Sequence, residues 1–236
     1  MRIAILTTKT THHAFFVYEI KKRYSNIDVF LEMKKKFKKF KTSHNVDKKI
    51  DNYEKKRCFQ NSKKFLKEFY KRQEIKNFNS PKFLKILKKK KYDLIIVFGS
   101  GIIKPKLINL YKRKIFNLHG GDPQSYRGLD SLLWSIFNNE FEKIVTTLHL
   151  LEQKIDAGRI YQIKKIKLQK KMKYHELRYY NTLNCINLTD KLILNLIYKK
   201  KINLRHQKSA GRYYTAMPSS LKDFCIKKFE RHTNYL

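Results

Sequence analysis

The sequence predicts an α/β fold built on a mostly parallel, doubly wound sheet. Two continuous apolar runs, residues 3–6 and 94–98, are typical of strands that are buried on both faces of a sheet. Segments with helical spacing alternate with the strand-like runs, and this order gives parallel strands covered by helices. A hydrophobic fraction of 42% is enough to form one main core. With 236 residues, the chain is too short for two full domains with separate cores.

The N-terminal third is predicted to begin with a strand at residues 3–6, a helix around Phe15, Phe16 and Ile20, and a second strand at 26–32. Residues 31–91 then hold 23 basic and 6 acidic residues. Apolar side chains recur through that stretch at loosely helical spacing, which predicts charged helices and not an unstructured tail. They are Phe37, Phe40, Ile50, Tyr53, Phe59, Phe65, Leu66 and Phe69. Ser80 followed by Pro81 marks the start of a helix over 81–90.

The remaining elements follow the same alternation. Strands are predicted at 94–98, 114–118 and 144–153 and after Asp156, with helices at 106–111, 129–137 and 174–200. The tail "GRYYTAMPSS" has turn residues at both ends and predicts a small hairpin or arm. We therefore expect one domain over residues 1–200 and a C-terminal extension, not a separate domain, over residues 201–236.

The charge of the chain has two interpretations. A net charge of +36 fits a polyanionic partner such as nucleic acid or an anionic membrane face. However, only 11 of the 55 basic residues are Arg, the residue best suited to bidentate phosphate recognition, so a compositional bias explains most of the charge. In this interpretation we expect no nucleic-acid partner, while the positive field helps to gather an anionic small molecule.

The cysteines and the N-terminus indicate in which compartment the protein is expected. Three cysteines without paired spacing predict neither a disulfide framework nor a zinc site, so we expect no metal and a reduced, cytoplasmic location. The apolar run at the N-terminus is too short for a signal peptide or a membrane span. Aromatic residues near the C-terminus make a homodimer plausible.

Three polar residues form the candidate chemical site. Asn117 and His119 stand two apart at a strand end, so their side chains point to the same side. Asp156 lies in "KIDAGRI", where a turn can present its carboxylate. An amide, an imidazole and a carboxylate suit acyl transfer to a nitrogen nucleophile: the amide N–H can hold the oxyanion, the imidazole can move a proton, and the carboxylate can fix the imidazole or accept a proton itself.

The stretch "FNLHGGDPQSYRGLDSLLWSIFNN…VTTLHLLEQKIDAGRI" resembles the catalytic core of the 10-formyltetrahydrofolate-dependent formyltransferases, which have a Rossmann-like fold. The Asn-x-His strand end, the loop reaching Tyr-Arg-Gly, the helix, the strand and the Asp-x-Gly turn come in the family's order. The resemblance implies that Asn117 and His119 polarise the formyl carbonyl of the co-substrate, and that Asp156 orients His119 or relays the proton of the attacking amine.

The resemblance also implies two sets of binding residues. The pterin of the folate is expected against main-chain groups of Phe98, Gly99, Ser100, Gly101, Ile102, Leu151 and Ile155. The amine substrate is expected near Thr10, His12, His13, Gly120, Gly121, Tyr126, Arg127 and Gly128. The glycines would let the backbone close around a substrate. Adjacent histidines equally suit a capping role, and Arg127 could instead pin its loop through a carboxylate.

Three features bear on the branch of the family. "GGDPQS" replaces the family's commoner loop after the histidine, "TTKTTHHAFF" replaces a Gly-Ser phosphate loop, and about 36 residues follow Lys200 where the Met-tRNA branch carries a β-barrel. The sequence therefore favours sugar N-formyltransferases, which act on amino sugars attached to nucleoside diphosphates. The alternatives are glycinamide ribonucleotide formylation, hydrolysis of the formyl-folate, and a basic nucleic-acid-binding protein with a vestigial core.

Overall fold

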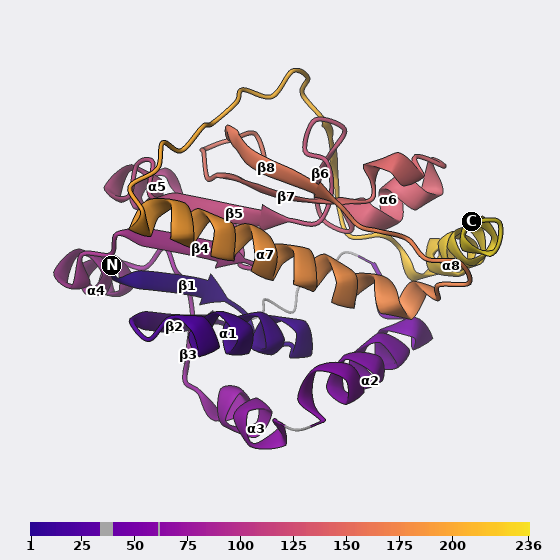
Figure 1. The fold of residues 1–236 in the computed structure, drawn as a ribbon, viewed down its shortest axis with the longest axis horizontal. Coiled ribbons are helices and arrows are strands. Elements are labelled where there is room, and N and C mark those ends of the chain that lie inside the picture. The colour runs from indigo at the N-terminus through magenta and orange to yellow at the C-terminus, as the bar shows by residue number, and fades with distance from the viewer. Residues whose placement is uncertain (34–39, 61) are drawn as a thin grey trace.

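The computed structural model describes residues 1–33, 40–60 and 62–236, so Phe37 lies outside the described residues. At its centre is a sheet of seven described strands (Figure 1). They are β1 Ile3–Thr7, β2 Ile27–Glu32, β3 Glu74–Ile75, β4 Leu94–Phe98, β5 Ile115–His119, β7 Val145–Leu150 and β8 Ile160–Lys165.

The strands lie in the order β3-β2-β1-β4-β5-β7-β8. The first five are parallel to one another, while β7 pairs antiparallel with β5 and β8 antiparallel with β7. The predicted mostly parallel α/β fold is therefore confirmed. Because the chain leaves β1 toward β2 on one side and returns to β4 on the other, the sheet has a switch point between β1 and β4, where such folds bind ligands beyond the carboxyl ends of the strands.

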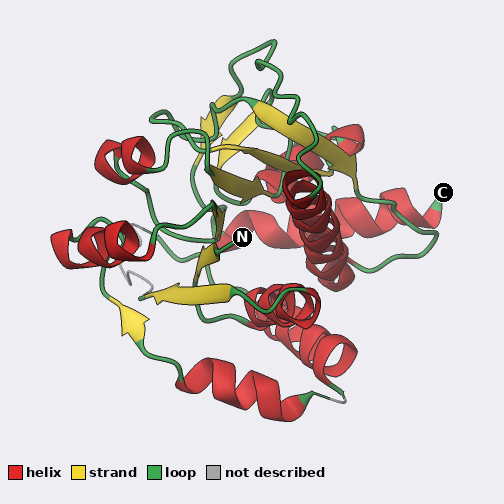
Figure 2. Ribbon diagram, turned by 60° about the vertical axis from the view of Figure 1, so that its left-hand side comes forward, coloured by secondary structure: helices red, strands yellow, loops and turns green. Residues whose placement is uncertain are grey.

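Helices cover both faces of this sheet (Figure 2). They are α1 Thr11–Arg23, α2 Asn45–Phe59, α3 Lys63–Lys71, α4 Pro81–Lys90, α5 Pro105–Leu110, α6 Ser131–Phe137, α7 Leu177–Ile197 and α8 Ser219–Asn234. Apolar residues of α1 and α7 pack on one face, and those of α4 and α5 on the other. Alternate residues of β1 supply the two cores, Ile3 and Ile5 to the first and Ala4 and Leu6 to the second, as the two-residue repeat of a strand requires.

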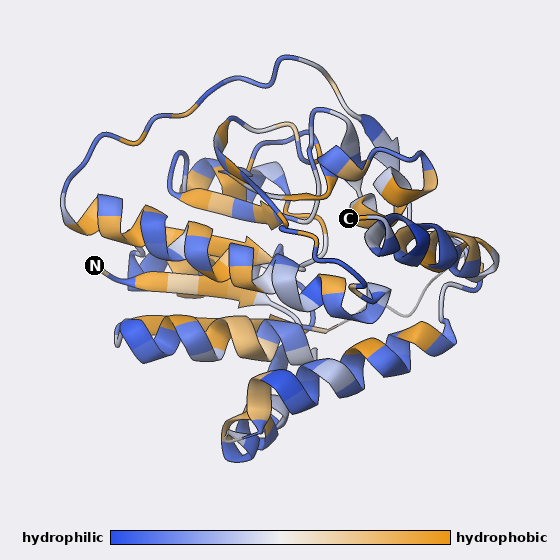
Figure 3. Cartoon of the chain, turned by 45° about the vertical axis from the view of Figure 1, so that its right-hand side comes forward, coloured by the Kyte–Doolittle hydropathy of each residue, from blue (hydrophilic) through white to orange (hydrophobic). Residues whose placement is uncertain are grey.

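Two charged helices, α2 and α3, form in the lysine-rich stretch as predicted, whereas Phe40 is 42% exposed and lies outside any helix. α2 and α3 expose hydrophilic residues along most of their length (Figure 3), yet Phe59 and Phe69 are buried against the core that contains α1. α4 starts where predicted, since the Ser80 hydroxyl accepts the Phe83 N–H at 3.3 Å and Pro81 occupies the first turn.

The C-terminal extension forms an arm, and the alternative of a hairpin is wrong. The short strand β9 (Arg212–Tyr214) pairs in parallel with β6 (Tyr126–Gly128), which lies far away in the sequence. The helix α8, which was not predicted, follows β9 and buries Cys225 and Phe229 in a third apolar cluster with residues of α6. Residues 201–214, which we call the C-terminal arm, thus run from α7 to the region of β6 (Figure 1).

Candidate active site

The site is built around the carboxyl end of β5. β5 lies beside β4 with Asn117 opposite Val97, and on its other side β7 places His149 opposite Asn117 and Thr147 opposite His119. Directly opposed residues of an antiparallel pair share a face, so the side chains of Asn117 and His149 meet. Their Nδ2 and Nε2 atoms are 3.2 Å apart.

Asp156 reaches the same place from the turn between β7 and β8. Its φ angle of 49° is in the left-handed region, which is unfavourable for a residue with a side chain. The turn packs tightly, because a Cβ atom at Gly158 would collide with the Leu150 carbonyl, so only glycine fits that position. As a result the Asp156 side chain points inward and is 8% exposed.

Both carboxylate oxygens of Asp156 lie close to polar groups of the site. Oδ1 lies 3.1 Å from Asn117 Nδ2 and 3.4 Å from His149 Nε2. Oδ2 accepts the Gly128 N–H at 2.8 Å and lies 3.4 Å from His119 Nδ1. Burial by itself raises the pKa of Asp156, but the neighbouring His119, His149 and Gly128 N–H outweigh it and hold that pKa well below its usual range. Asp156 is therefore ionised at neutral pH.

Main-chain carbonyls determine where the histidine protons lie. His119 Nε2 is 2.8 Å from the Tyr126 carbonyl and His149 Nδ1 is 2.7 Å from the Leu150 carbonyl, and because carbonyls only accept, both nitrogens carry hydrogen. Neutral His149 then has an acceptor at Nε2, which suits the Asn117 amide. His119 Nδ1 lies 3.4 Å from Asp156 Oδ2, as His149 Nε2 does from Oδ1, so a His119 ring with hydrogen on both nitrogens would donate to the carboxylate and to the Tyr126 carbonyl.

Both amide hydrogens of Asn117 already have acceptors within this cluster. Its two Nδ2 hydrogens point to Asp156 Oδ1 and to His149 Nε2, which leaves Oδ1 without a partner among these three residues. Asn117 can therefore donate to a substrate oxygen only by giving up one of these two hydrogen bonds.

The loop after β1 lies at the switch point of the sheet. Thr10 Oγ1 is 2.6 Å from His13 Nδ1 and 3.1 Å from His12 Nδ1. His13 is 5% exposed and its ring meets the edge of Phe98 at 4.5 Å between centroids. It also lies against Gly99, where a Cβ atom would collide with the imidazole. His13 therefore supports the end of β4, while its neighbour His12 is 3.9 Å from Glu54 of α2.

The residues predicted around the pterin differ in their exposure. Phe98 is buried and packs on His13, whereas Ile102 is 68% and Ile155 is 37% exposed. The Gly101 N–H donates to Glu32 at 2.7 Å, so that main-chain donor is occupied by this protein's own carboxylate. Of the remaining predicted residues, Ser100 is half-buried with its hydroxyl bonded to the next carbonyl, and Leu151 packs against the second apolar cluster.

The loop after His119 is held in place by close contacts with other segments of the protein. A Cβ atom at Gly121 would lie 2.7 Å from Ser131 and one at Gly120 would lie 3.3 Å from Asn181, so both glycines make close packing contacts. Gly128 has a φ angle of 93° and faces the carbonyl of Tyr214 in β9, which leaves no space for a side chain.

Tyr126 and Arg127 also contact the protein. The Tyr126 hydroxyl donates to Glu140 at 2.6 Å, and its main-chain carbonyl faces His119. Arg127 donates to the Pro123 carbonyl at 3.0 Å and to Gln207 Oε1 at 2.6 Å. Arg127 thus pins its loop, through a carbonyl and an amide and not through a carboxylate.

Sequence reasoning missed three residues near this cluster. His149 could have been found by aligning the alternating run at 144–150 against the strand that carries Asn117. Gln207 contacts the main chain of the Asp156 turn. A contact between a side chain and a distant backbone carbonyl produces no pattern in the sequence. The Ser131 hydroxyl is buried beside Gly121 and has no hydrogen-bond partner among the described residues.

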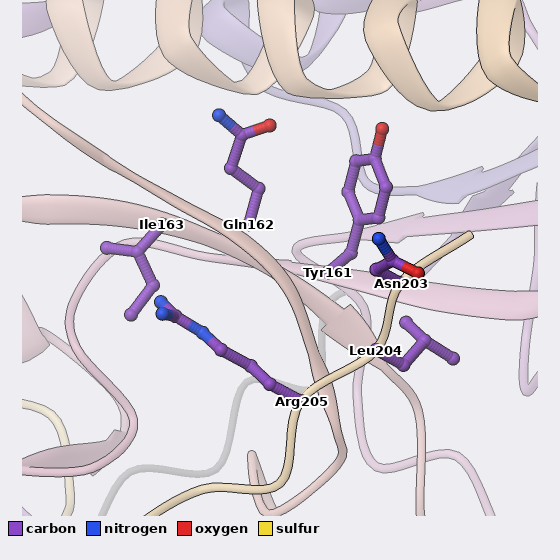
Figure 4. Close-up of a pocket in the computed structure, with 6 residues that line it drawn as sticks. All are labelled: Tyr161, Gln162, Ile163, Asn203, Leu204 and Arg205. Atoms are coloured by element: carbon purple, nitrogen blue, oxygen red, sulfur yellow. The ribbon is translucent and has the colours of Figure 1, made fainter. Parts of the chain in front are cut away.

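Two surface pockets lie elsewhere. One, of about 390 Å³, is lined by residues of β8 and of the C-terminal arm, none of them a predicted site residue (Figure 4). The other, of about 600 Å³, lies between α2 and α3 and is lined largely by lysines above Phe59 and Leu66. In the described part of the chain no group of three His, Cys, Asp or Glu residues could hold a metal ion. No helix of that part has both the length and the apolar surface to cross a membrane.

An α/β sheet that gathers an amide, imidazoles and an ionised carboxylate at its carboxyl edge has the equipment of an acyl-group transferase. The comparison with known proteins is more specific. Residues 1–184 match the family described as Formyl transferase, and the chain belongs to that family. The family resemblance stated from the sequence is thus confirmed.

Sequence relatives match only part of their own length. Methionyl-tRNA formyltransferase of Finegoldia magna is 33% identical over 103 residues, which are 43% of this chain and 33% of that protein. The bifunctional polymyxin resistance protein ArnA of Wigglesworthia glossinidia brevipalpis is 33% identical over 132 residues, 54% of this chain and 19% of that protein. The chain spans a third or less of the length of these relatives.

Solved structures share the fold at low identity. A sugar N-formyltransferase from a Shewanella species has a TM-score of 0.63 at 16% identity, with 95% of this chain and 80% of that chain covered. A 4-N formyltransferase from Francisella tularensis has a TM-score of 0.61 at 18% identity, covering 91% and 76%. The formyltransferase PseJ from Anoxybacillus kamchatkensis, in complex with UDP-4,6-dideoxy-4-formamido-L-AltNAc and tetrahydrofolate, has a TM-score of 0.53 at 16% identity, covering 95% and 89%.

Proposed function

We propose that this protein transfers a formyl group from 10-formyltetrahydrofolate to the amine of an amino sugar linked to a nucleoside diphosphate. The observation that carries the proposal is the convergence of Asn117, His119 and Asp156 at the carboxyl edge of the sheet. Membership of the formyl transferase family supports the reaction. The sugar substrate is supported by the fold, since structures with this fold are described as sugar N-formyltransferases.

The reaction needs two proton movements. The amine nitrogen attacks the formyl carbon, and the carbonyl oxygen becomes an oxyanion. Collapse of the tetrahedral intermediate breaks the bond to the folate nitrogen, which gains a proton, while the amine loses one. His119 can serve both needs in turn: its Nε2–H, which donates to the Tyr126 carbonyl in the structure, can turn to the oxyanion and then pass to the folate nitrogen as the bond breaks, and the deprotonated Nε2 takes up the proton that the amine loses.

Asp156 orients His119 in this mechanism and does not itself accept the proton. A carboxylate whose pKa is held well below its usual range is a weak base, but its fixed negative charge stabilises a positive imidazole. Asn117 assists by holding Oδ1 of that carboxylate at 3.1 Å. The residue pattern left open whether Asp156 orients His119 or relays the proton of the amine, and the proposal keeps only the first role.

A second candidate acceptor is the amine of an aminoacyl-tRNA. The observation that favours it is sequence similarity to proteins named methionyl-tRNA formyltransferase, at 33–36% identity over 87–103 residues. Glycinamide ribonucleotide is a third acceptor of the same chemical kind, and it is an alternative within the same reaction class.

One assay separates these acceptors. The protein is incubated with 10-formyltetrahydrofolate and, in parallel, with nucleoside-diphosphate 4-amino sugars, glycinamide ribonucleotide or methionyl-tRNA, and mass spectrometry identifies which acceptor gains a formyl group. Formylation of an amino sugar is the expected result. Transfer only to one of the other amines would replace the sugar proposal, and formate release without any acceptor would indicate a hydrolase.

A further inference from the structure

We propose that Gln207 is a positioning residue that holds the Asp156 turn in its active conformation. The inference rests on the proposed function, because it takes Asp156 to be part of the reacting site. It assigns to the C-terminal arm a direct part in building that site.

The side chain of Gln207 is fully used in this contact. Its Nε2 donates to the Asp156 carbonyl at 2.7 Å and to the Gly158 carbonyl at 2.9 Å. Its Oε1 accepts from Arg127 Nη2 at 2.6 Å. One amide thus bridges two carbonyls on either side of Ala157 and connects the turn to the loop that follows His119.

The turn needs such an external partner. Asp156 holds a left-handed backbone conformation that is costly for a residue with a side chain. Within the turn, the Ala157 N–H makes a 3.2 Å hydrogen bond to Lys154, and this bond leaves the Asp156 and Gly158 carbonyls unused. Gln207 satisfies those two carbonyls in the orientation that directs the Asp156 carboxylate inward.

The arm places Gln207 accurately because it is fixed on both sides. Two residues before it, Arg205 exchanges two backbone hydrogen bonds with Ile160, of 2.8 and 3.0 Å, beside the pocket in Figure 4. After it, the Arg212 N–H donates to the Ser125 carbonyl at 3.0 Å, and β9 then pairs with β6.

The same arm also acts on the carboxylate itself. β9 pairs with Gly128, whose N–H donates to Asp156 Oδ2 at 2.8 Å. The main chain of Asp156 is therefore held by Gln207 and its side chain by a residue that β9 supports. Both contacts fix the position of the negative charge relative to His119.

The test compares Gln207→Ala, Gln207→Glu and the control Lys208→Ala, whose exposed side chain makes none of these contacts. With the acceptor that the wild type formylates, Gln207→Ala is expected to lower kcat by about 10–100-fold while the KM of each substrate changes by less than about threefold. Gln207→Glu keeps an oxygen for Arg127 but sets a carboxylate against two carbonyls, so it is expected to be at least as impaired. Lys208→Ala is expected to behave as wild type.

A second measurement does not depend on the substrate. Backbone hydrogen exchange over residues 154–159 is expected to quicken in both Gln207 variants and not in Lys208→Ala, with the exchange of β4 and β5 unchanged. Wild-type kcat in Gln207→Ala, or full activity in Gln207→Glu, would overturn the inference, and so would unchanged exchange at the turn. A wild-type protein that formylates no amine would instead count against the proposed function, and the exchange result would still stand.

Discussion

Asn117 and His149 face each other across β5 and β7, and their side-chain nitrogens are 3.2 Å apart. His149 is fully buried and bonds to the Leu150 carbonyl through its other nitrogen. The imidazole therefore links the main chain of β7 to the amide that holds Asp156. This relationship means that Asn117 is oriented by two groups at once, and it makes His149 a second histidine of the site.

His119 is the residue whose loss should affect turnover most. Replacing His119 with Ala removes the group placed to exchange a proton and to hold the oxyanion, so kcat is expected to fall by about 10²–10⁴-fold. Asn117→Ala and Asp156→Ala should also lower kcat by orders of magnitude, and the fold should persist. Initial rates and circular dichroism spectra check this, with His206→Ala, an exposed histidine, as the control. Near-normal turnover in His119→Ala would eliminate the mechanism.

His149→Ala is expected to cost both stability and activity. It leaves the Leu150 carbonyl and one Asn117 hydrogen without partners in a buried place, which destabilises the fold by about 1–3 kcal/mol. The loss in kcat should be smaller than in His119→Ala, because His149 acts through Asn117 and Asp156. Urea denaturation gives the free energy of unfolding, and initial rates give kcat. Equal losses of kcat in the two variants would place His149 in contact with the substrate instead.

Removal of Asp156 should change how stability depends on pH. The folded state lowers the pKa of Asp156 below its ordinary value of 3.8, so its contribution to stability is present above about pH 4 and is lost as the pH falls further toward the folded pKa. Wild type should therefore lose stability relative to Asp156→Asn on acidification below pH 4. Urea unfolding at several pH values measures the difference. A constant difference across that range would contradict the lowered pKa.

Arg178 should be essential for stability and not for the chemistry. Its guanidinium bonds both carboxylate oxygens of Glu54, at 2.6 and 2.7 Å, and the Glu54 side chain is 0% exposed. Arg178→Ala leaves a buried charge without its partner, and such losses cost about 3–5 kcal/mol. Arg178→Lys keeps the charge but not the paired geometry and should lie between. Thermal unfolding of the two variants and of Glu54→Gln checks the order, which an unchanged Tm in Arg178→Ala would contradict.

The net charge of +36 should not produce tight binding to nucleic acid if the acceptor is a sugar nucleotide. Binding that depends on lysine charge alone weakens steeply with salt, so retention on duplex or single-stranded nucleic acid should be lost at ~150 mM salt. Fluorescence anisotropy over a salt series measures it, with a tRNA included as a probe. Binding to tRNA that persists at that salt would favour the aminoacyl-tRNA acceptor.

The sequence predicted those parts that depend on local patterns. The apolar runs of β4 and β5 and the long helix α7 lie where periodicity placed them. α8 was not predicted although Leu221, Cys225 and Phe229 repeat at helical spacing, because the Gly, Pro and Ser residues just before it are typical of a turn. His149 and Gln207 could not be found in the same way, since the first depends on which strand pairs with β5 and the second on a side chain that meets a backbone 51 positions away.

The pairing of β9 with β6 has a consequence for how the protein matures. All seven strands of the sheet and α7 precede the C-terminal arm in the chain, so the sheet can be covered by α7 before the residues that hold the Asp156 turn have been made. The newly made chain can thus fold its sheet before its active site is complete. A protease cut between Arg205 and Arg212 would free the Asp156 turn from the arm, so the molecule would lose activity while its sheet stays intact.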